Sequence, residues 1–440
     1  MENHRAWTKR STAGILFGAF ALSGCMFGGG QSAKDVEATR AQPALAQIQE
    51  KELNGQQSQL INILLARQSV VPQGTAFDTV ADAVLASNAR TAESDLRAAR
   101  LRAQAKSSNW LPSIGPVISL TSLGDIVAQL VVEQVLFDNG RARAERDFAA
   151  HDVEAAAVGL SQDSNARVAT ALDLYIKAQR ARAEARVAER AQGRMSEFVS
   201  IIERRVNGGV SNMADLSVAR SKMQELNAEL ARAREGEATS LAELEAMANL
   251  SLGAVDGLTQ INTGTAGLYP LNVLQARAEG DRTMAQALVN RADLLPGVVA
   301  GGTAGEGGLD IGVQVSGDQL INLGTGSALE AIQASQESAR RGVVQAEEDN
   351  RRIVSRLEQK RAALQRQQAE SAALVSEARQ TYELFFRQFR NSGRPIMDVV
   401  NIYENAMRLE RDSVRLKYEL AQIQVEIASL YGTLVSGGDV

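Results

Sequence analysis

The chain has 440 residues, of which 4% are aromatic and 22% are charged, and its formal net charge is -5. Few aromatic residues beside abundant alanine, leucine, arginine, glutamate and glutamine are typical of long helices and coiled coils rather than compact globular domains. The near-balanced charge argues against nucleic acid as a partner, because phosphate binding needs a net basic surface and the arginines here alternate with acidic residues.

The N-terminal residues predict export and lipid attachment. Basic residues precede an apolar run over residues 13–22 that is too short to cross a bilayer as a helix, which indicates a signal peptide over residues 1–24. The run ends in Leu22-Ser23-Gly24-Cys25, which resembles the bacterial lipobox, whose cysteine is diacylated and becomes the mature N-terminus. Met26 follows, as in outer-membrane lipoproteins, so we expect a lipid anchor on Cys25 in that membrane. The alternative is a free thiol after an ordinary signal peptide.

The next stretch predicts a linker and then a helix. Residues 25–75 are expected to form a lipid-anchored linker that begins with the flexible tether Gly28-Gly29-Gly30 and contains helical stretches between residues 44 and 67. Apolar spacing then predicts one helix from Phe77 to Ser108, which Trp110-Leu111-Pro112 terminates.

Alternating hydrophobicity predicts two pairs of strands. The first pair is predicted at Ser113–Thr121 and Asp125–Phe137, and the same alternation recurs around Ile311. One face of the second strand is apolar and consists of Ile126, Ala128, Leu130, Val132 and Leu136, whereas Gln129 and Glu133 lie on the other. This pattern predicts hairpins with one apolar and one wet side, and an ordinary half-buried soluble hairpin fits the same spacing.

Very long helices are predicted after each strand pair. The chain contains no proline from Arg141 to Val206 or from Thr325 to Asn391, and each stretch would span about 100 Å as a helix. Gly-bearing turns at 206–211 and 390–395 then reverse the chain. The return helices carry apolar residues in steps of three and four, which predicts coiled-coil pairing with the long helices. The first long helix repeats this spacing with smaller residues: Ala171, Leu174, Ala178, Ala181, Ala185 and Ala188.

An internal duplication organises the chain. One offset of 184 residues relates Gly140 to Gly324, Leu111-Pro112 to Leu295-Pro296, Asn207 to Asn391, Gly209 to Gly393 and Met213 to Met397. Such coincidences indicate two copies of one unit, with Gly140 and Gly324 at the strand-to-helix junctions. We expect a first repeat at 76–250 with its strand pair at 111–137, a connector at 251–270, a second repeat at 271–435 with its strand pair at 295–321, and a tail at 436–440.

Four strands are too few to close a membrane barrel, whose smallest single-chain form has about eight, so strands in lipid would need other copies of the chain. With the duplication, the Leu-Pro strand entries and the tip turns, the chain from Phe77 to Gly432 resembles the TolC-type outer-membrane factor family. The resemblance implies a mainly α fold with a small β part, in which a long coiled α-helical barrel continues an antiparallel transmembrane β-barrel and the whole closes as a homotrimer.

The resemblance also implies a function and its sites. Such a protein is the export duct of a tripartite efflux pump or a type I secretion system, and it conducts substrate passively from a periplasmic adaptor and an inner-membrane transporter. The implied adaptor-contacting tip residues are Gly208, Gly209, Gly393 and Arg394, and Arg394 matches a basic residue that holds the closed state. Asp398 matches one acidic position of the periplasmic entrance constriction, whereas Asn401 replaces another, so this entrance carries fewer negative charges.

Other readings of these residues remain open. Asp398 could simply cap a helix start. A lipid-anchored periplasmic coiled-coil adaptor or envelope spacer that forms no pore would share the composition. No phosphate-binding loop or Cys and His cluster is present in the sequence, so we expect neither an enzyme nor a cofactor. His151 is expected to be a solvated surface residue.

Overall fold

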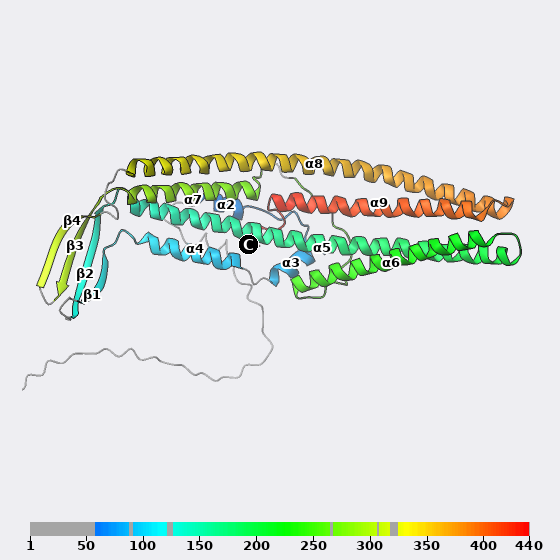
Figure 1. The fold of residues 1–440 in the computed structure, drawn as a ribbon, viewed down its shortest axis with the longest axis horizontal. Helices are drawn as coiled ribbons and strands as arrows, with labels where there is room; N and C mark the ends of the chain where they lie inside the picture. The colour runs from blue at the N-terminus through cyan, green and yellow to red at the C-terminus, as the bar shows by residue number, and fades with distance from the viewer. Residues whose placement is uncertain are drawn as a thin grey trace, which may run out of the picture. The chain divides into compact units, whose positions relative to one another are not determined.

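The computed structural model describes residues 58–87, 91–120, 126–264, 267–305, 308–316 and 324–439. A helix, two strands, a very long helix and a return helix follow one another twice along the chain (Figure 1). The elements are α2 (Gln59–Leu65), α3 (Ala76–Ala86), α4 (Thr91–Ser107), β1 (Ser113–Leu120), β2 (Ile126–Phe137), α5 (Arg141–Asn207), α6 (Met213–Ala248), α7 (Leu271–Asp293), β3 (Gly297–Gly305), β4 (Gly308–Ser316), α8 (Thr325–Ser392), α9 (Ile396–Leu430) and the short 3-10 helix η1 (Gly437–Asp439).

The two predicted long helices are confirmed. α5 has 67 residues and α8 has 68, and neither contains the proline that would interrupt its backbone hydrogen bonds. The carboxylate of Asp138 accepts hydrogen bonds from the amides of Gly140 and Ala142, at 3.0 and 2.6 Å, and so satisfies free N–H groups at the start of α5. At about 1.5 Å per residue, each helix extends roughly 100 Å.

The predicted pairing of long and return helices is also confirmed, because α5 packs along α6 and α8 packs along α9. The small residues expected at the α5 seam are buried: Ala171, Leu174, Ala178, Ala181, Ala185 and Ala188. Near its start, α5 instead packs against α4 and α7. There Asp152 of α5 forms one ion pair with Arg102 of α4 and another with Arg282 of α7. Helix α9 also packs on α5, so α5 joins the two helical hairpins.

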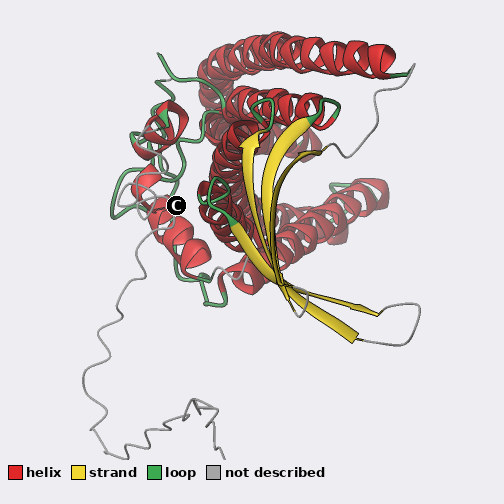
Figure 2. Cartoon of the chain, turned by 90° about the vertical axis from the view of Figure 1, so that its left-hand side faces the viewer, coloured by secondary structure: helices red, strands yellow, loops and turns green. Residues whose placement is uncertain are grey.

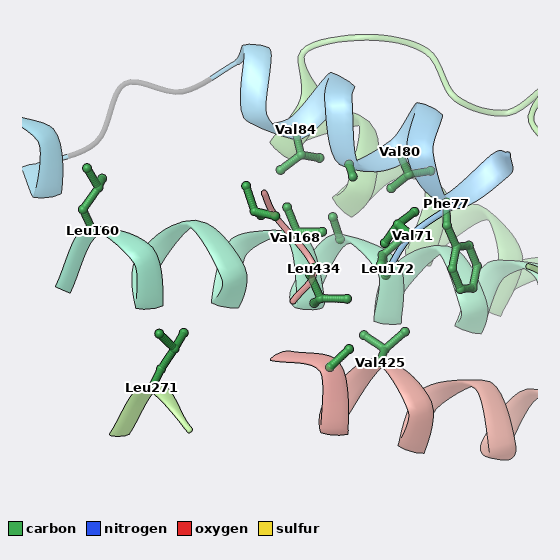
Figure 3. Packing of buried hydrophobic residues seen from close by; sticks show 14 of the residues in the cluster. Val71, Phe77, Val80, Val84, Leu160, Val168, Leu172, Leu271, Val425 and Leu434 are labelled. Carbon is green, nitrogen blue, oxygen red and sulfur yellow. The ribbon is translucent and has the colours of Figure 1, made fainter. Parts of the chain in front are cut away.

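The main core surrounds the middle of α5. Figure 3 shows apolar side chains of α3 facing those of α5, with Val425 of α9 on the other side of α5, and Leu434 belongs to the same cluster. The ring of Phe77 meets Tyr175 edge-on, with ring centroids 5.9 Å apart. Burial of these side chains stabilises the contact between elements that lie far apart in the sequence.

The chain on the N-terminal side of α3 is bound to the C-terminal segment. The amide of Val70 donates to the carbonyl of Thr433 at 2.8 Å, and the amide of Gly437 donates to the carbonyl of Arg67 at 2.9 Å. The buried Asn165 of α5 accepts a hydrogen bond from the amide of Leu434 at 2.9 Å. These bonds hold the C-terminal residues inside the core, where Leu434 is 2% exposed.

The single helix predicted from Phe77 to Ser108 is wrong, because the chain forms α3 and α4 instead. Arg167 of α5 donates to the carbonyls of Val84 and Met247, and the hydroxyl of Ser87 also donates to Met247. These tertiary bonds engage the carbonyl of Val84 and the hydroxyl of Ser87 at the end of α3. Tertiary contacts of this kind override the local helical pattern. Of the helical stretches predicted between residues 44 and 67, α2 is the described part; residues 44–57 lie outside the described residues.

The four strands form one antiparallel sheet in the order β1-β2-β3-β4, which Figure 2 shows as curved ribbons. The first predicted strand pair is confirmed as the β1–β2 hairpin, and the second strand pair forms as β3 and β4. A bulge between Val135 and Phe137 places Phe137 opposite Val298, so Leu136, predicted on the apolar face, has no partner in the regular ladder.

None of the described helices combines the length and the apolar character needed to cross a membrane.

Candidate functional site

One face of the sheet is almost entirely apolar and uncovered. Cross-strand partners align Ile114, Val132, Gly302 and Ile311 in one row, and Pro116, Leu130, Ala304 and Leu309 in the next. The apolar face, as we name it, carries these large side chains with their exposed fractions: Ile114 66%, Ile118 72%, Leu130 48%, Val132 37%, Leu309 72%, Ile311 74%, Val313 68% and Val315 76%. Gln134 is its polar member, and its amide donates to the carbonyl of Trp110 at 3.2 Å. Such an exposed patch marks an interaction surface.

The opposite side, the mixed face, has a different composition. Its rows are Ser113, Glu133, Gly301 and Gly312; Gly115, Val131, Thr303 and Asp310; and Val117, Gln129, Gly305 and Gly308. Gln314 also lies on this face, opposite Val299. Because side chains alternate between the two sides of a strand, the sheet separates an apolar surface from one that contains polar groups, as predicted.

Both edges of the sheet are open within this chain. Among the described residues, β1 pairs with β2 alone and β4 with β3 alone. Each edge therefore presents unpaired backbone donors and acceptors, which favour pairing with another strand.

The strand-to-helix junction at Gly140 requires its glycine, whereas the one at Gly324 does not. Asn139 and Gly140 have φ of 54° and 85°, values that glycine and asparagine adopt more easily than other residues. Gly324 has φ of -84°, which any residue adopts, although it does precede α8 as predicted. Residues 317–323, which precede it, lie outside the described residues.

The first tip turn lies between α5 and α6. The amide of Gly209 donates to the carbonyl of Val206 at 3.0 Å, and the amide of Val210 donates to that of Arg205 at 2.8 Å. This is the Schellman arrangement, and it uses the positive φ of 71° at Gly209. Gly208 has φ of -85° and caps α5 without needing a glycine conformation.

The second tip turn joins α8 to α9 through Gly393, Arg394 and Pro395. Gly393 has φ of 71°, the same value as Gly209. The guanidinium of Arg394 lies over the ring of Phe385, with its Cζ 4.0 Å from the ring centroid. Its Nη1 is buried without a hydrogen-bond partner in the described part of the chain. A stacked guanidinium with a free donor can still bind an acceptor from another molecule.

The two predicted entrance residues lie on the exposed side of α9. Asp398 is in the first turn of the helix, and Asn401 follows three residues later, so both side chains share a face. Between them, Val399 and Val400 are fully buried and fix the orientation of the helix. The structure thus presents Asp398 and Asn401 to the surroundings close to the tip turn.

Comparison with known proteins finds a similar family over part of the chain. Residues 83–250 match the family model described as outer membrane efflux protein. This match spans less than half of the chain, and over it the chain is similar to the outer membrane efflux protein family. No curated protein sequence matches the chain.

Solved structures of outer membrane channels share the fold of this chain. The outer membrane protein VceC of Vibrio cholerae is 16% identical with a TM-score of 0.72, and the match covers 82% of this chain and 97% of VceC. The CmeC outer membrane channel of Campylobacter jejuni is 14% identical with a TM-score of 0.69, covering 82% and 86%. The open-state MtrE channel of Neisseria gonorrhoeae is also 14% identical with a TM-score of 0.69, covering 84% and 95%.

An aromatic cluster behind the tip turns was not predicted from the sequence. Phe198 of α5 meets Tyr403 of α9 at 5.7 Å and Phe386 of α8 at 6.4 Å between ring centroids. Arg194 lies over the Phe386 ring at 5.0 Å. Burial raises the pKa of Tyr403 to about 12, so its hydroxyl stays neutral. The concentration of aromatic residues at 382–389, in a chain with so few, is the signal that could have revealed this cluster.

A charged contact next to the cluster ties three helices together. Glu410 of α9 accepts from Arg190 of α5 at 2.6 Å and from Arg379 of α8 at 2.8 Å. Burial alone would raise the pKa of Glu410, but the hydrogen bonds from Arg379 and Arg190 outweigh it and hold the pKa below its usual value. No local sequence pattern indicates this triad, because its members are remote from one another in the chain.

His151 does not fit the prediction of a solvated residue. Its Nδ1 lies 2.8 Å from a carboxylate oxygen of Glu154, and its side chain is 33% exposed. This hydrogen bond outweighs the effect of burial and raises the pKa of His151. Glu154 also accepts a hydrogen bond from Ser58 at 2.5 Å, so the pair attaches the segment before α2 to α5.

Proposed function

We propose that the protein is the outer-membrane channel of an export system and conducts substrate passively out of the periplasm. The observation that carries this proposal is the sheet, with an uncovered apolar face on one side and a mixed face on the other. In water the apolar face would be costly, whereas in a bilayer lipid would cover it.

A homotrimer follows from the open edges of the sheet. Backbone groups at β1 and β4 could not remain unpaired in hydrocarbon, where each would cost several kcal/mol. Three copies would supply twelve strands, and β1 of one copy would pair with β4 of the next. The apolar face would then point outward to lipid, and the mixed face would line the lumen.

The helices would continue this barrel as a periplasmic tunnel. With a length of about 100 Å, they would hold the tip turns far from the membrane under this proposal. Under this proposal, a periplasmic adaptor binds around Gly208, Gly209, Gly393 and Arg394, and an inner-membrane transporter supplies the energy. Either an efflux pump or a type I secretion system could use such a duct, and the fold is common to both.

We also propose that Cys25 is lipidated. Ser58, the first described residue, contacts Glu154, which is 14 residues along the chain from the junction at Gly140 and thus about 20 Å along α5 from the strands. The 32 residues between Cys25 and Ser58 can extend up to about 110 Å. The tether is therefore long enough for a lipid on Cys25 to reach the membrane that holds the sheet.

The oligomeric mass of the protein tests the channel. We expect the detergent-extracted protein to have about three times the mass of the mature chain by light scattering, and to migrate differently in gels before and after heating because folded membrane barrels resist SDS. The same should hold for a variant with Cys25→Ala behind an ordinary cleaved signal peptide, since the sheet itself would hold the protein in the membrane. A monomer or dimer that needs no detergent without the lipid would instead support the periplasmic spacer.

Gating at the tip gives a further test. A neighbouring copy could offer an acceptor to the free Nη1 of Arg394 in the closed state, and Asp398 lies exposed nearby on α9. Removing interactions worth about 0.5–1 kcal/mol should shift the equilibrium toward the open state about two- to fivefold. We therefore expect Arg394→Ala or Asp398→Ala to raise the time-averaged conductance of single channels in planar bilayers.

The exposed Arg390, in the last turn of α8, provides the matched control. Arg390→Ala removes the same charge near the tip and should leave conductance as in the wild type. Unchanged conductance in both Arg394→Ala and Asp398→Ala would refute the gating role.

A further inference from the structure

The hydroxyl of Ser58 joins α2 to α5 at the start of the described chain. It accepts a hydrogen bond from the amide of Ile61 at 3.3 Å, which caps the N-terminus of α2, and it donates to Oε1 of Glu154 at 2.5 Å. Glu154 belongs to α5. Its carboxylate is therefore a polar contact that fixes the first turn of α2 on the long helix.

The same carboxylate is held from its other side by His151, one turn earlier on α5. Nδ1 of His151 lies 2.8 Å from Oε2 of Glu154, whereas Ser58 binds Oε1. Each oxygen of the carboxylate thus has its own partner. A protonated imidazole makes the contact with Glu154 a charge-assisted hydrogen bond, which is stronger than one between neutral groups.

Acidic side chains from two helices face His151. Asp147 lies four residues before it on the same side of α5, and Asp281 belongs to α7, which packs against α5. The hydrogen bond from Glu154 favours the protonated imidazole, and the fields of Glu154, Asp281 and Asp147 add to this effect. Together they outweigh partial burial, so the pKa of His151 is raised above its ordinary value of 6.5.

The nearby arginines are engaged by other carboxylates. On α7, Arg277 pairs with Glu347 at 2.6 Å, and Arg282 pairs with Asp152 at 3.2 Å. The field of Arg277 also reaches Asp281, but the positive field that acts on Glu154 comes from His151. Loss of the proton from His151 therefore leaves Glu154 without a cation and close to other carboxylates that repel it.

We infer that His151 and Glu154 form a pH-sensitive clasp that holds the start of α2 on α5 while the imidazole is protonated. The clasp concerns the fold of this chain alone, so it does not depend on the proposed channel. A group whose pKa is raised in the folded state stabilises that state fully below its unfolded pKa, and the contribution is lost as the pH rises through the folded pKa. The attachment should therefore weaken as the pH rises above about 6.5.

The clasp sets the place where the N-terminal segment leaves the helical body. Ile61 and Leu64 are 5% and 1% exposed, so burial keeps α2 in the core when the clasp opens. Opening then frees the first turn of α2 rather than the whole helix. The segment that leads to Cys25 would start a few residues later and reach further at higher pH.

Hydrogen exchange of the full-length protein tests the clasp. The readout is the protection of the amides in residues 58–65 from about pH 5.5 to about pH 8.5, corrected for the pH dependence of intrinsic exchange. We expect protection to decrease about two- to fivefold across this range, as for the loss of one partly exposed ion pair.

Two conservative variants separate titration from a merely structural role. His151→Gln keeps a polar side chain that does not titrate in this range, and Glu154→Gln keeps an acceptor for Ser58 without the charge. In both variants, protection of residues 58–65 should be independent of pH and close to the level that the wild type reaches at high pH.

The start of α3 provides the internal control. Thr75 caps this helix as Ser58 caps α2, but its hydroxyl donates to the carbonyl of Pro72 rather than to a carboxylate. Residues 75–82 should therefore keep their protection across the pH range in all three proteins, which also shows that the variants are folded. A decrease at residues 58–65 that is as large in His151→Gln as in the wild type would overturn the inference.

Discussion

Replacing Ile311 with lysine should abolish the folded membrane trimer. Ile311 is 74% exposed on the apolar face, in the row with Ile114, Val132 and Gly302. A lysine facing lipid near the bilayer midplane costs about 2–4 kcal/mol, and a trimer carries the substitution three times. We expect loss of the heat-modifiable, SDS-resistant band and a large decrease in protein recovered from the outer membrane.

Gln314→Lys is the matched control for this substitution. Gln314 lies on the same strand but on the mixed face, where a charged side chain would project into the lumen. We expect this variant to assemble like the wild type. If Ile311→Lys and Gln314→Lys assemble equally well, the apolar face does not contact lipid, and the sheet must be covered by something else.

The second large effect is expected at Arg67, which links three segments of the chain. Arg67 is 4% exposed, and its guanidinium donates to the carbonyl of Tyr269 at 2.7 Å and to that of Tyr431. Burial lowers its pKa to about 10, which still leaves it charged at neutral pH. Arg67→Met would leave both carbonyls without this donor, at about 1–3 kcal/mol each. We expect the helical part to unfold about 3 °C lower by circular dichroism.

Two further variants make the Arg67 result specific. Arg97→Met removes an exposed arginine from α4 and should leave the unfolding temperature unchanged. Gly432→Ala should destabilise in the same way as Arg67→Met, because Gly432 has φ of 64° and a Cβ there would collide with the Arg67 guanidinium and Leu271. An unchanged unfolding temperature in Arg67→Met would show that this contact contributes little.

The elements with strong local patterns could be predicted from the sequence. The long helices and their return helices have few breakers and a regular apolar spacing, and α5 and α8 begin at the predicted residues. The alternation in β2 and β4 likewise predicted the two faces of the sheet. These features depend on residues a few positions apart, so periodicity is enough to reveal them.

Other features depended on contacts that no local pattern contains. The separation of α3 from α4 involves Arg167, which bonds the end of α3 from α5. The bulge that places Phe137 opposite Val298 depends on pairing with β3, which lies more than a hundred residues away in the chain. His151 was misjudged because a charged helix face predicts solvent, whereas Glu154 and the segment before α2 enclose it in part.

The sequence by itself determined the order and length of the elements, the alternation that separates the two sheet faces, and the chemistry of the tip turns, because backbone conformation and amphipathic spacing are local properties. The tertiary structure decided which distant groups meet: the aromatic cluster of Phe198, Phe386 and Tyr403, the Glu410 ion pairs, and the C-terminal segment held inside the core by Asn165. Such contacts bring together residues with no sequence proximity, and the free energy of burying them selects one arrangement among many with the same local pattern.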